Sequence, residues 1–151
     1  MIAGVKIKPL KIWPDDRGFL YETLRKDDQF FKKFGQSNVT MTYPGVIKAF
    51  HWHKKQDDYW VCVQGMIQTV LYDLRPNSKT KGEIQEIYMG EQSPVLVYIP
   101  HGVVHGYKVL GPKPAILVYY TSEVYNSEKP DEERIPYDDP EIDFNWETQN
   151  R

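Results

Sequence analysis

Three histidines and one aspartate are the side chains in this sequence best suited to bind a metal ion or to move a proton. His51 and His53 stand one residue apart, Asp58 follows them, and His105 comes later in the chain. Alternate residues of a strand point to the same face, so His51 and His53 are expected to face one space. We predict a pocket shared by these histidines, rather than separate hydrogen-bonded or solvated rings, and we expect His101 to face solvent from a turn.

The surroundings of these residues resemble the two sequence motifs of the cupin superfamily. Gly45 and Gly65 frame the first motif, and a Pro-x-Gly turn precedes the last histidine. Members of that superfamily are small β-barrels in which two histidines, a carboxylate and a third histidine converge on a divalent metal. The resemblance implies the ligand set His51, His53, Asp58 and His105, although the carboxylate is usually glutamate. Three imidazoles and one oxygen suit zinc, iron, nickel and manganese alike.

Short runs rich in valine, isoleucine, tyrosine and tryptophan predict the strands that position this pocket. They cover residues 4–13, 19–25, 38–43, 46–53, 59–64, 66–74, 84–90, 94–99, 104–110 and 115–120. Many short strands separated by turn residues are typical of an all-β sandwich or barrel. Residues 26–35 predict the one short helix, which places Phe30, Phe31 and Phe34 on one face and ends at Gly35. We expect the acidic tail, residues 127–151, to wrap the surface with little regular structure.

The composition predicts a single domain, residues 1–151, that is large enough to bury a core. The net charge of -2 gives no basic footprint, which excludes nucleic acid as a main partner. Residues 1–121 nevertheless carry sixteen basic against eleven acidic residues, a balance that suits a small anionic ligand. We find no signal peptide and no run long enough to cross a membrane. With Cys62 predicted as a buried, unpaired and inert thiol, we expect a cytoplasmic protein.

Further short motifs, spread over nearly the whole chain, resemble the dTDP-4-dehydrorhamnose 3,5-epimerase family. They are Asp16-Arg17-Gly18 with Glu22, Gln36-Ser37-Asn38, Gly45-Val46, residues 73–82, Ile99-Pro100, His105-Gly106-Tyr107, Tyr119 to Tyr125 and Asp138-Asp139-Pro140. The resemblance implies a cupin barrel, or double-stranded β-helix, that forms a homodimer. It also implies inversion at C3, C5 or both of a nucleotide-linked 4-keto-6-deoxyhexose in deoxysugar and polysaccharide biosynthesis, with no metal or other cofactor required.

Such chemistry needs a base on one face of a carbon beside the ketone and an acid on the other. By resemblance His51 is the base and Tyr119 the acid. The implied substrate contacts are Arg17, Glu22, Gln36, Asn38, Lys48, Asp58, His105, Tyr125 and Glu132. Among them Arg17 and Glu22 would reach across the dimer. Strict alternation places Lys48 on the face opposite His51, so its role requires a bulge near Ala49.

The chain departs from the family pattern at several positions of the predicted site. Lys48 and Ala49 stand where the family has arginine and glycine, and His53 replaces a glutamine. Asp58 stands where the family has a lysine that steadies the enolate, and losing such a donor typically lowers the rate by about 10²- to 10³-fold. The chain also ends before the family's C-terminal Lys-Asp segment.

These departures leave other functions open. One is a metal-dependent cupin enzyme in which His51, His53, Asp58 and His105 hold an ion that supplies the missing positive charge. A sugar 3,4-ketoisomerase, a related cupin type with His-x-His, is another. The third is a non-catalytic cupin that binds a nucleotide sugar, with Tyr119 and Tyr125 as ordinary strand aromatics.

Overall fold

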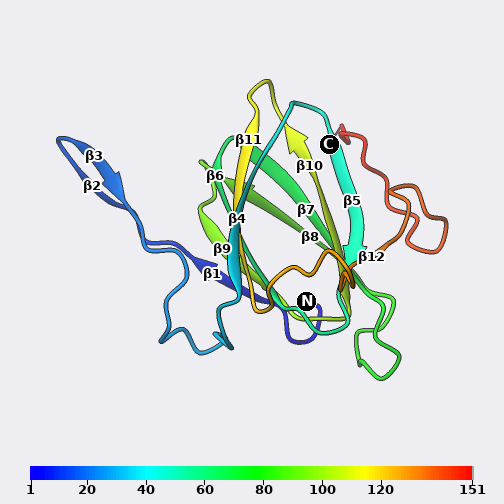
Figure 1. Cartoon of the computed structure of the whole chain (residues 1–151). Coiled ribbons are helices and arrows are strands. Elements are labelled where there is room, and N and C mark those ends of the chain that lie inside the picture. Colours follow the sequence, from blue (N-terminus) through cyan, green and yellow to red (C-terminus); the bar gives the residue numbers. More distant parts are fainter. Residues whose placement is uncertain (151) are drawn as a thin grey trace.

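The strands form two five-stranded antiparallel sheets that face each other (Figure 1), and the computed structural model describes residues 1–150. The first sheet runs in the order β1 (Lys6–Pro9), β9 (Val95–Ile99), β6 (Asp58–Gln64), β11 (Ala115–Thr121) and β4 (Gln36–Thr42). The second runs β12 (Glu133–Arg134), β5 (Ile47–Trp52), β10 (Val103–Leu110), β7 (Met66–Asp73) and β8 (Ile84–Gly90). The all-β prediction is therefore confirmed.

The main core fills the space between the two sheets. Trp60 and Leu117 of the first sheet and Leu71 and Val109 of the second belong to one buried cluster. The chain crosses between the sheets through tight turns such as the one at Gly65, where φ is +72°. A β carbon at Gly65 would lie 2.6 Å from a backbone oxygen of the facing strand connection, so glycine is required there.

The helix predicted over residues 26–35 is wrong, because this segment consists of turns and extended chain. Phe30 and Phe31 both pack against Tyr59, with ring centroids 6.4 Å away in each case. Packing on the outer face of the first sheet therefore overrides the helical pattern, and Phe34 stays exposed.

A separate hairpin formed by β2 (Trp13–Asp15) and β3 (Gly18–Leu20) extends away from the sheets (Figure 1). The strands predicted over residues 4–13 and 19–25 are correspondingly shorter and divided. Trp13, Phe19 and Leu20 are exposed on this hairpin.

Strand β5 carries the bulge that Lys48 requires. His51 pairs with His105 and Lys48 pairs with Tyr107, so Ala49 and Phe50 together oppose Gly106 alone. The extra residue in β5 shifts the alternation of side chains by one, so Lys48 points to the same face as His51. Gly106 permits this approach, because a β carbon there would lie 2.4 Å from that of Ala49.

The tail is mostly irregular, as predicted, but it is anchored on the second sheet. Glu133 and Arg134 of β12 pair with Trp52 and His51 of β5. Further on, Trp146 is buried in a cluster with Phe50. Among residues 1–150 there is no helix with the length and apolar character needed to cross a membrane.

Candidate active site

A cavity of about 680 Å³ opens between the sheets and is lined by strands β4, β5, β6 and β11 and by the tail. It brings together nine residues named from the sequence: Gln36, Asn38, Lys48, His51, His53, Asp58, Tyr119, Tyr125 and Glu132. His105 lies directly against His51, with ring centroids 4.2 Å apart, and is buried. The shared histidine pocket is thus present in the structure.

Arg17 and Glu22 lie outside the cavity of their own chain. The Arg17 side chain is 83% exposed on the hairpin and pairs with Asp15 at 2.5 Å. Glu22 pairs with Arg25 at 2.7 Å. Neither contact connects these side chains to the histidine cluster.

Two backbone carbonyls fix the orientation of the histidines beneath the cavity. Nδ1 of His53 donates to the carbonyl of Asp131, and Nδ1 of His105 donates to that of Val103 at 2.9 Å. Each ring therefore turns Nε2 toward Asp58, whose Oδ2 lies 3.8 Å from His53 and 3.5 Å from His105. In the neutral tautomers both nitrogens present lone pairs to a carboxylate.

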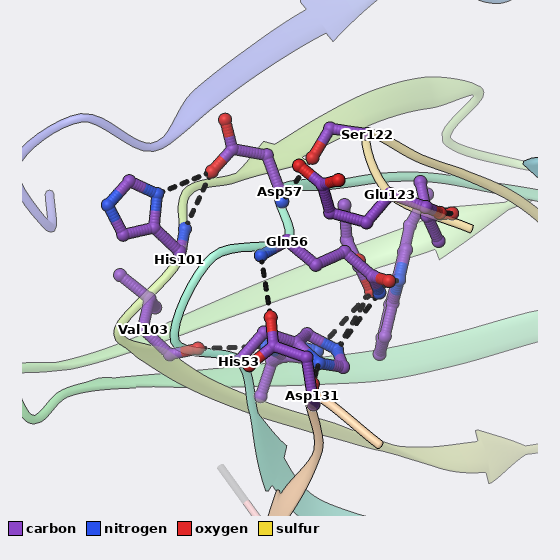
Figure 2. Close-up of polar contacts among 12 residues, drawn as sticks. His53, Gln56, Asp57, His101, Val103, Ser122, Glu123 and Asp131 are labelled. Carbon is purple, nitrogen blue, oxygen red and sulfur yellow. Dashed lines mark hydrogen bonds and ion pairs between the residues drawn. The ribbon is translucent and has the colours of Figure 1, made fainter. Parts of the chain in front are cut away.

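Gln56 supplies a hydrogen-bond donor to two of these neighbouring acceptor atoms. Its amide nitrogen donates to Oδ1 of Asp58 at 2.8 Å and to Nε2 of His53 at 3.2 Å. Figure 2 shows Gln56 above His53, with Asp131 beside the ring. Nε2 of His105 has no hydrogen-bond partner within residues 1–150 although it is buried. Such an atom is unusual in a native interior and indicates a site for a proton or a cation.

Asp58 is a carboxylate side chain with only 1% of its surface exposed. Burial raises its pKa, but the close approach of His105, followed by the neighbouring His53 and His51, lowers the pKa to about 2. The indole nitrogen of Trp60 also donates to Oδ2 at 3.1 Å. The lowered pKa favours the ionised form of Asp58 at neutral pH.

His51 and Tyr119 face the cavity from opposite sheets. Burial, followed by the charge of His105, lowers the pKa of His51, so its ring is a neutral base. Burial, followed by the charge of Asp58, raises the pKa of Tyr119, so its phenol keeps a proton to donate. Neither side chain has a hydrogen-bond partner in the described part of the chain, which leaves both for a ligand.

Residues of the tail complete the site and were missed from the sequence. The carboxylate of Asp131 accepts the backbone N–H groups of Lys54, Lys55 and Gln56 at 2.9 to 3.0 Å. Arg134 lines the cavity and pairs with His51. No local pattern marks either residue, because each meets the site from about 75 or more positions away in the sequence.

Asp57 links three segments next to the site through hydrogen bonds. Its carboxylate accepts hydrogen bonds from the backbone N–H and Nδ1 of His101 at 2.8 to 2.9 Å (Figure 2). It also accepts a hydrogen bond from the hydroxyl of Tyr98 at 2.9 Å. Its own N–H donates to Ser122 at 2.9 Å. The His101 side chain is 59% exposed, which confirms the prediction of a solvent-facing turn histidine.

Two facing antiparallel sheets with a histidine-rich cavity between them define a small cupin-type barrel. The sequence pattern of one family, described as dTDP-4-dehydrorhamnose 3,5-epimerase, matches residues 1–151. The chain belongs to this family, as its motifs indicated.

Comparisons with individual proteins agree. The chain is 54% identical over 151 residues to the spore coat polysaccharide biosynthesis protein SpsL of Bacillus subtilis, with 100% of each covered. It resembles the crystal structure of a dTDP sugar isomerase from Desulfovibrio desulfuricans with a TM-score of 0.89 and 29% identity, covering 96% of this chain and 92% of the other. It also resembles the crystal structure of the epimerase RmlC of Legionella pneumophila, solved with dTDP-4-keto-L-rhamnose. The TM-score is 0.84 and the sequence identity 28%, covering 97% of this chain and 80% of the other.

Proposed function

We propose that this protein is an epimerase that inverts C3, C5 or both in a nucleotide-linked 4-keto-6-deoxyhexose, in a route to a deoxysugar-containing polysaccharide. The observation that carries the proposal is the placement of His51 and Tyr119 on opposite sheets of one cavity, the first neutral and the second protonated. This is the pair of states that a base and an acid need. The solved relative with a dTDP-4-keto sugar supports the substrate class.

In the proposed reaction His51 removes the proton from a carbon beside the ketone, and the electron pair of the C–H bond moves onto the ketone oxygen. Tyr119 then protonates the same carbon from the other side, which inverts it. Acid and base groups are sufficient for these steps, so we propose that no cofactor is required.

The opposite part of the cavity suits a nucleotide diphosphate. Gln36 and Asn38 project from β4 and are joined by a 3.0 Å hydrogen bond. Gln36 also accepts the backbone N–H of Tyr125 at 2.8 Å, which holds the following loop over the cavity. Lys48 donates to the Thr40 hydroxyl at 2.9 Å and offers a cation for phosphate.

We further propose a homodimer in the cytoplasm. The β2–β3 hairpin extends from its own barrel with Arg17, Trp13 and Phe19 exposed, and Val39 and Met41 of β4 form another exposed apolar strip. Docking of the hairpin on a second copy would bury apolar surface and carry Arg17 to the partner's cavity. The buried free Cys62 suits a reducing compartment.

Deuterium exchange tests the proposed reaction. In heavy water the protein should introduce deuterium at carbons beside the ketone of a dTDP-linked 4-keto-6-deoxyhexose, and His51→Ala should abolish this. His101→Ala is the matched control, because His101 is a solvent-facing histidine in the turn between β9 and β10, and it should retain exchange. Product analysis distinguishes inversion from ketone migration. Absence of exchange with dTDP-, UDP-, GDP- and CDP-linked keto sugars would contradict the proposal, and binding without exchange would indicate a non-catalytic sugar-binding protein.

The unpartnered nitrogen of His105 favours a second candidate function, a metal-dependent reaction in the same cavity. The ligand atoms of His51, His53, Asp58 and His105 all lie within 4.8 Å of one another. The separations of 3.5 and 3.8 Å at Asp58 approach the roughly 3.4 Å between ligands of a tetrahedral site with bonds of about 2.1 Å. These residues therefore fit a divalent ion, which would polarise the ketone oxygen as a Lewis acid.

Metal analysis of protein purified without a histidine tag decides between the two candidates. A metal enzyme should contain about one ion per chain, lose it to a chelator together with its activity, and lose cobalt absorption bands in His105→Ala. Full activity of the metal-free protein would exclude a metal-dependent reaction.

A further inference from the structure

The proposed reaction needs a partner for the negative charge that develops on the ketone oxygen. Proton removal beside a ketone places charge on the oxygen, and enzymes hold that charge with preorganised donors or cations. The buried charged group next to His51 is instead the carboxylate of Asp58. Within residues 1–150 the cationic side chains that line the cavity are Lys48, Lys129 and Arg134.

Arg134 is the cation that the fold places beside the base. It pairs with His51 in the β12–β5 ladder. Directly opposite residues of an antiparallel pair point to the same face, with β carbons about 5 Å apart. Lys48, by contrast, reaches Thr40 on β4, the strand of Gln36 and Asn38, where we propose that it meets the diphosphate. The positive charge of Arg134 also reaches the His51 ring, where it contributes to the lowered pKa of His51 after burial and His105.

The guanidinium of Arg134 is oriented but not saturated. Its Nε donates to Glu132 at 2.7 Å, whereas the terminal nitrogens make no hydrogen bond to any residue in the described chain. The side chain is 84% exposed at the cavity wall. An arginine carries five N–H donors in a fixed plane, so one bond to Glu132 sets the plane and leaves the other edge for a ligand.

We propose that Arg134 contacts the ketone oxygen of the substrate and stabilises the enolate that forms when His51 removes the proton, and that Glu132 is a positioning residue for its guanidinium. This assignment rests on the proposed epimerase function. It gives the cation for the enolate to the tail, while Asp58 occupies the position of the family's lysine. No bond to Arg134 forms or breaks, because the C–H electron pair goes to the oxygen and the proton goes to His51.

Two substitutions separate charge from shape. Arg134→Gln keeps N–H donors but removes the charge, and Arg134→Lys keeps the charge. Lys54→Gln is the matched control: Lys54 binds Glu133, the neighbour of Arg134 on β12, at 2.5 Å, so it tests whether loosening β12 is enough. Deuterium exchange at saturating substrate and the affinity for dTDP are measured for each variant with a chelator present, and thermal unfolding verifies folding.

We expect Arg134→Gln to lower the exchange rate at saturation by about 10²- to 10³-fold, as the loss of one such donor does. Arg134→Lys should recover part of this, and dTDP affinity should change little. Glu132→Gln should lower the exchange rate at saturating substrate by a smaller factor and leave dTDP affinity unchanged. A merely structural role of Glu132 would change both quantities. Exchange retained in Arg134→Gln, or loss of dTDP binding at an unchanged rate, would overturn the assignment alone. Absence of exchange in the unsubstituted protein would overturn the proposed function and the assignment with it.

Discussion

Replacing Tyr119 with phenylalanine should separate the two halves of the proposed reaction. Removal of a proton by His51 and its return from solvent need no acid on the other face, so exchange without inversion should persist. Inversion requires the phenol. Positioned acids typically contribute about 10² to 10⁴ in rate, or roughly 3 to 5 kcal/mol of barrier. We therefore expect epimer formation to fall by that factor while deuterium exchange falls less than about tenfold.

The structure also indicates that folding should tolerate this substitution. The Tyr119 hydroxyl has no hydrogen-bond partner among residues 1–150, and the ring packs against the main core as phenylalanine would. The cost in unfolding free energy should stay within about 0.5 kcal/mol. A drop in activity with unchanged thermal unfolding then reports on chemistry.

Tyr120 provides the matched control on the same strand. Its ring lies on the opposite face of β11, in the second core cluster, and its hydroxyl is 2.8 Å from that of Thr23. Tyr120→Phe should lose about 1 kcal/mol of stability and keep both activities. Nuclear magnetic resonance of the sugar in heavy water measures exchange and inversion in one experiment. Wild-type inversion in Tyr119→Phe, or equal loss of exchange and inversion, would refute the assignment of Tyr119 as the acid.

Three further predictions concern the scaffold. Gly106→Ala should lower the unfolding free energy by about 1 to 3 kcal/mol, because the new β carbon would lie 2.4 Å from that of Ala49. Deuterium exchange should fall as well. Unchanged thermal unfolding would contradict this prediction and show that β5 can move away from the new methyl group. Asp73→Asn should lose about 1.5 to 3 kcal/mol at pH 7. Burial raises the pKa of Asp73, but hydrogen bonds from Arg75 and two hydroxyl groups lower it well below the ordinary carboxyl value. Its contribution to stability is thus present above pH about 4 and is lost as the pH falls toward the lowered pKa. The difference in melting temperature between the two proteins should narrow at pH 3, and a constant difference would contradict this. Burial raises the pKa of Cys62 to about 11, so a thiol reagent at pH 8 should label the unfolded chain and leave the native protein unlabelled.

Much of the fold was predictable because it depends on local alternation. Apart from β12 in the tail, the strands of both sheets were predicted to within a few residues, since their periodicity of two comes directly from burial of one or both faces. The placement of His51 and His53 in one cavity followed from the same rule, although β5 ends at Trp52. Even the bulge near Ala49 was predictable, because Lys48 and His51 could share a face in no other way.

The segments that failed are those decided by distant partners. Residues 26–35 have a helical pattern, yet Phe30 and Phe31 fold against Tyr59 because the first sheet offers them an apolar outer face. Asp131 and Arg134 act through pairing with a strand far away in sequence, which no local spacing encodes. Sequence motifs locate side chains that act together on neighbouring elements, whereas a tail that crosses the whole barrel contributes residues without any such pattern.

The charge arrangement around His51 follows from this difference. Asp58 comes from β6 of one sheet and raises the pKa of His51, whereas Arg134 comes from β12 of the other sheet and lowers it. The Asp58 carboxylate accepts hydrogen bonds from the side chains of Gln56 and Trp60. The guanidinium of Arg134 lines the cavity and leaves its terminal nitrogens without a partner among residues 1–150. Residues 45–65 therefore place the carboxylate of Asp58 next to His51, and the tail adds the guanidinium of Arg134 that enolate chemistry can use.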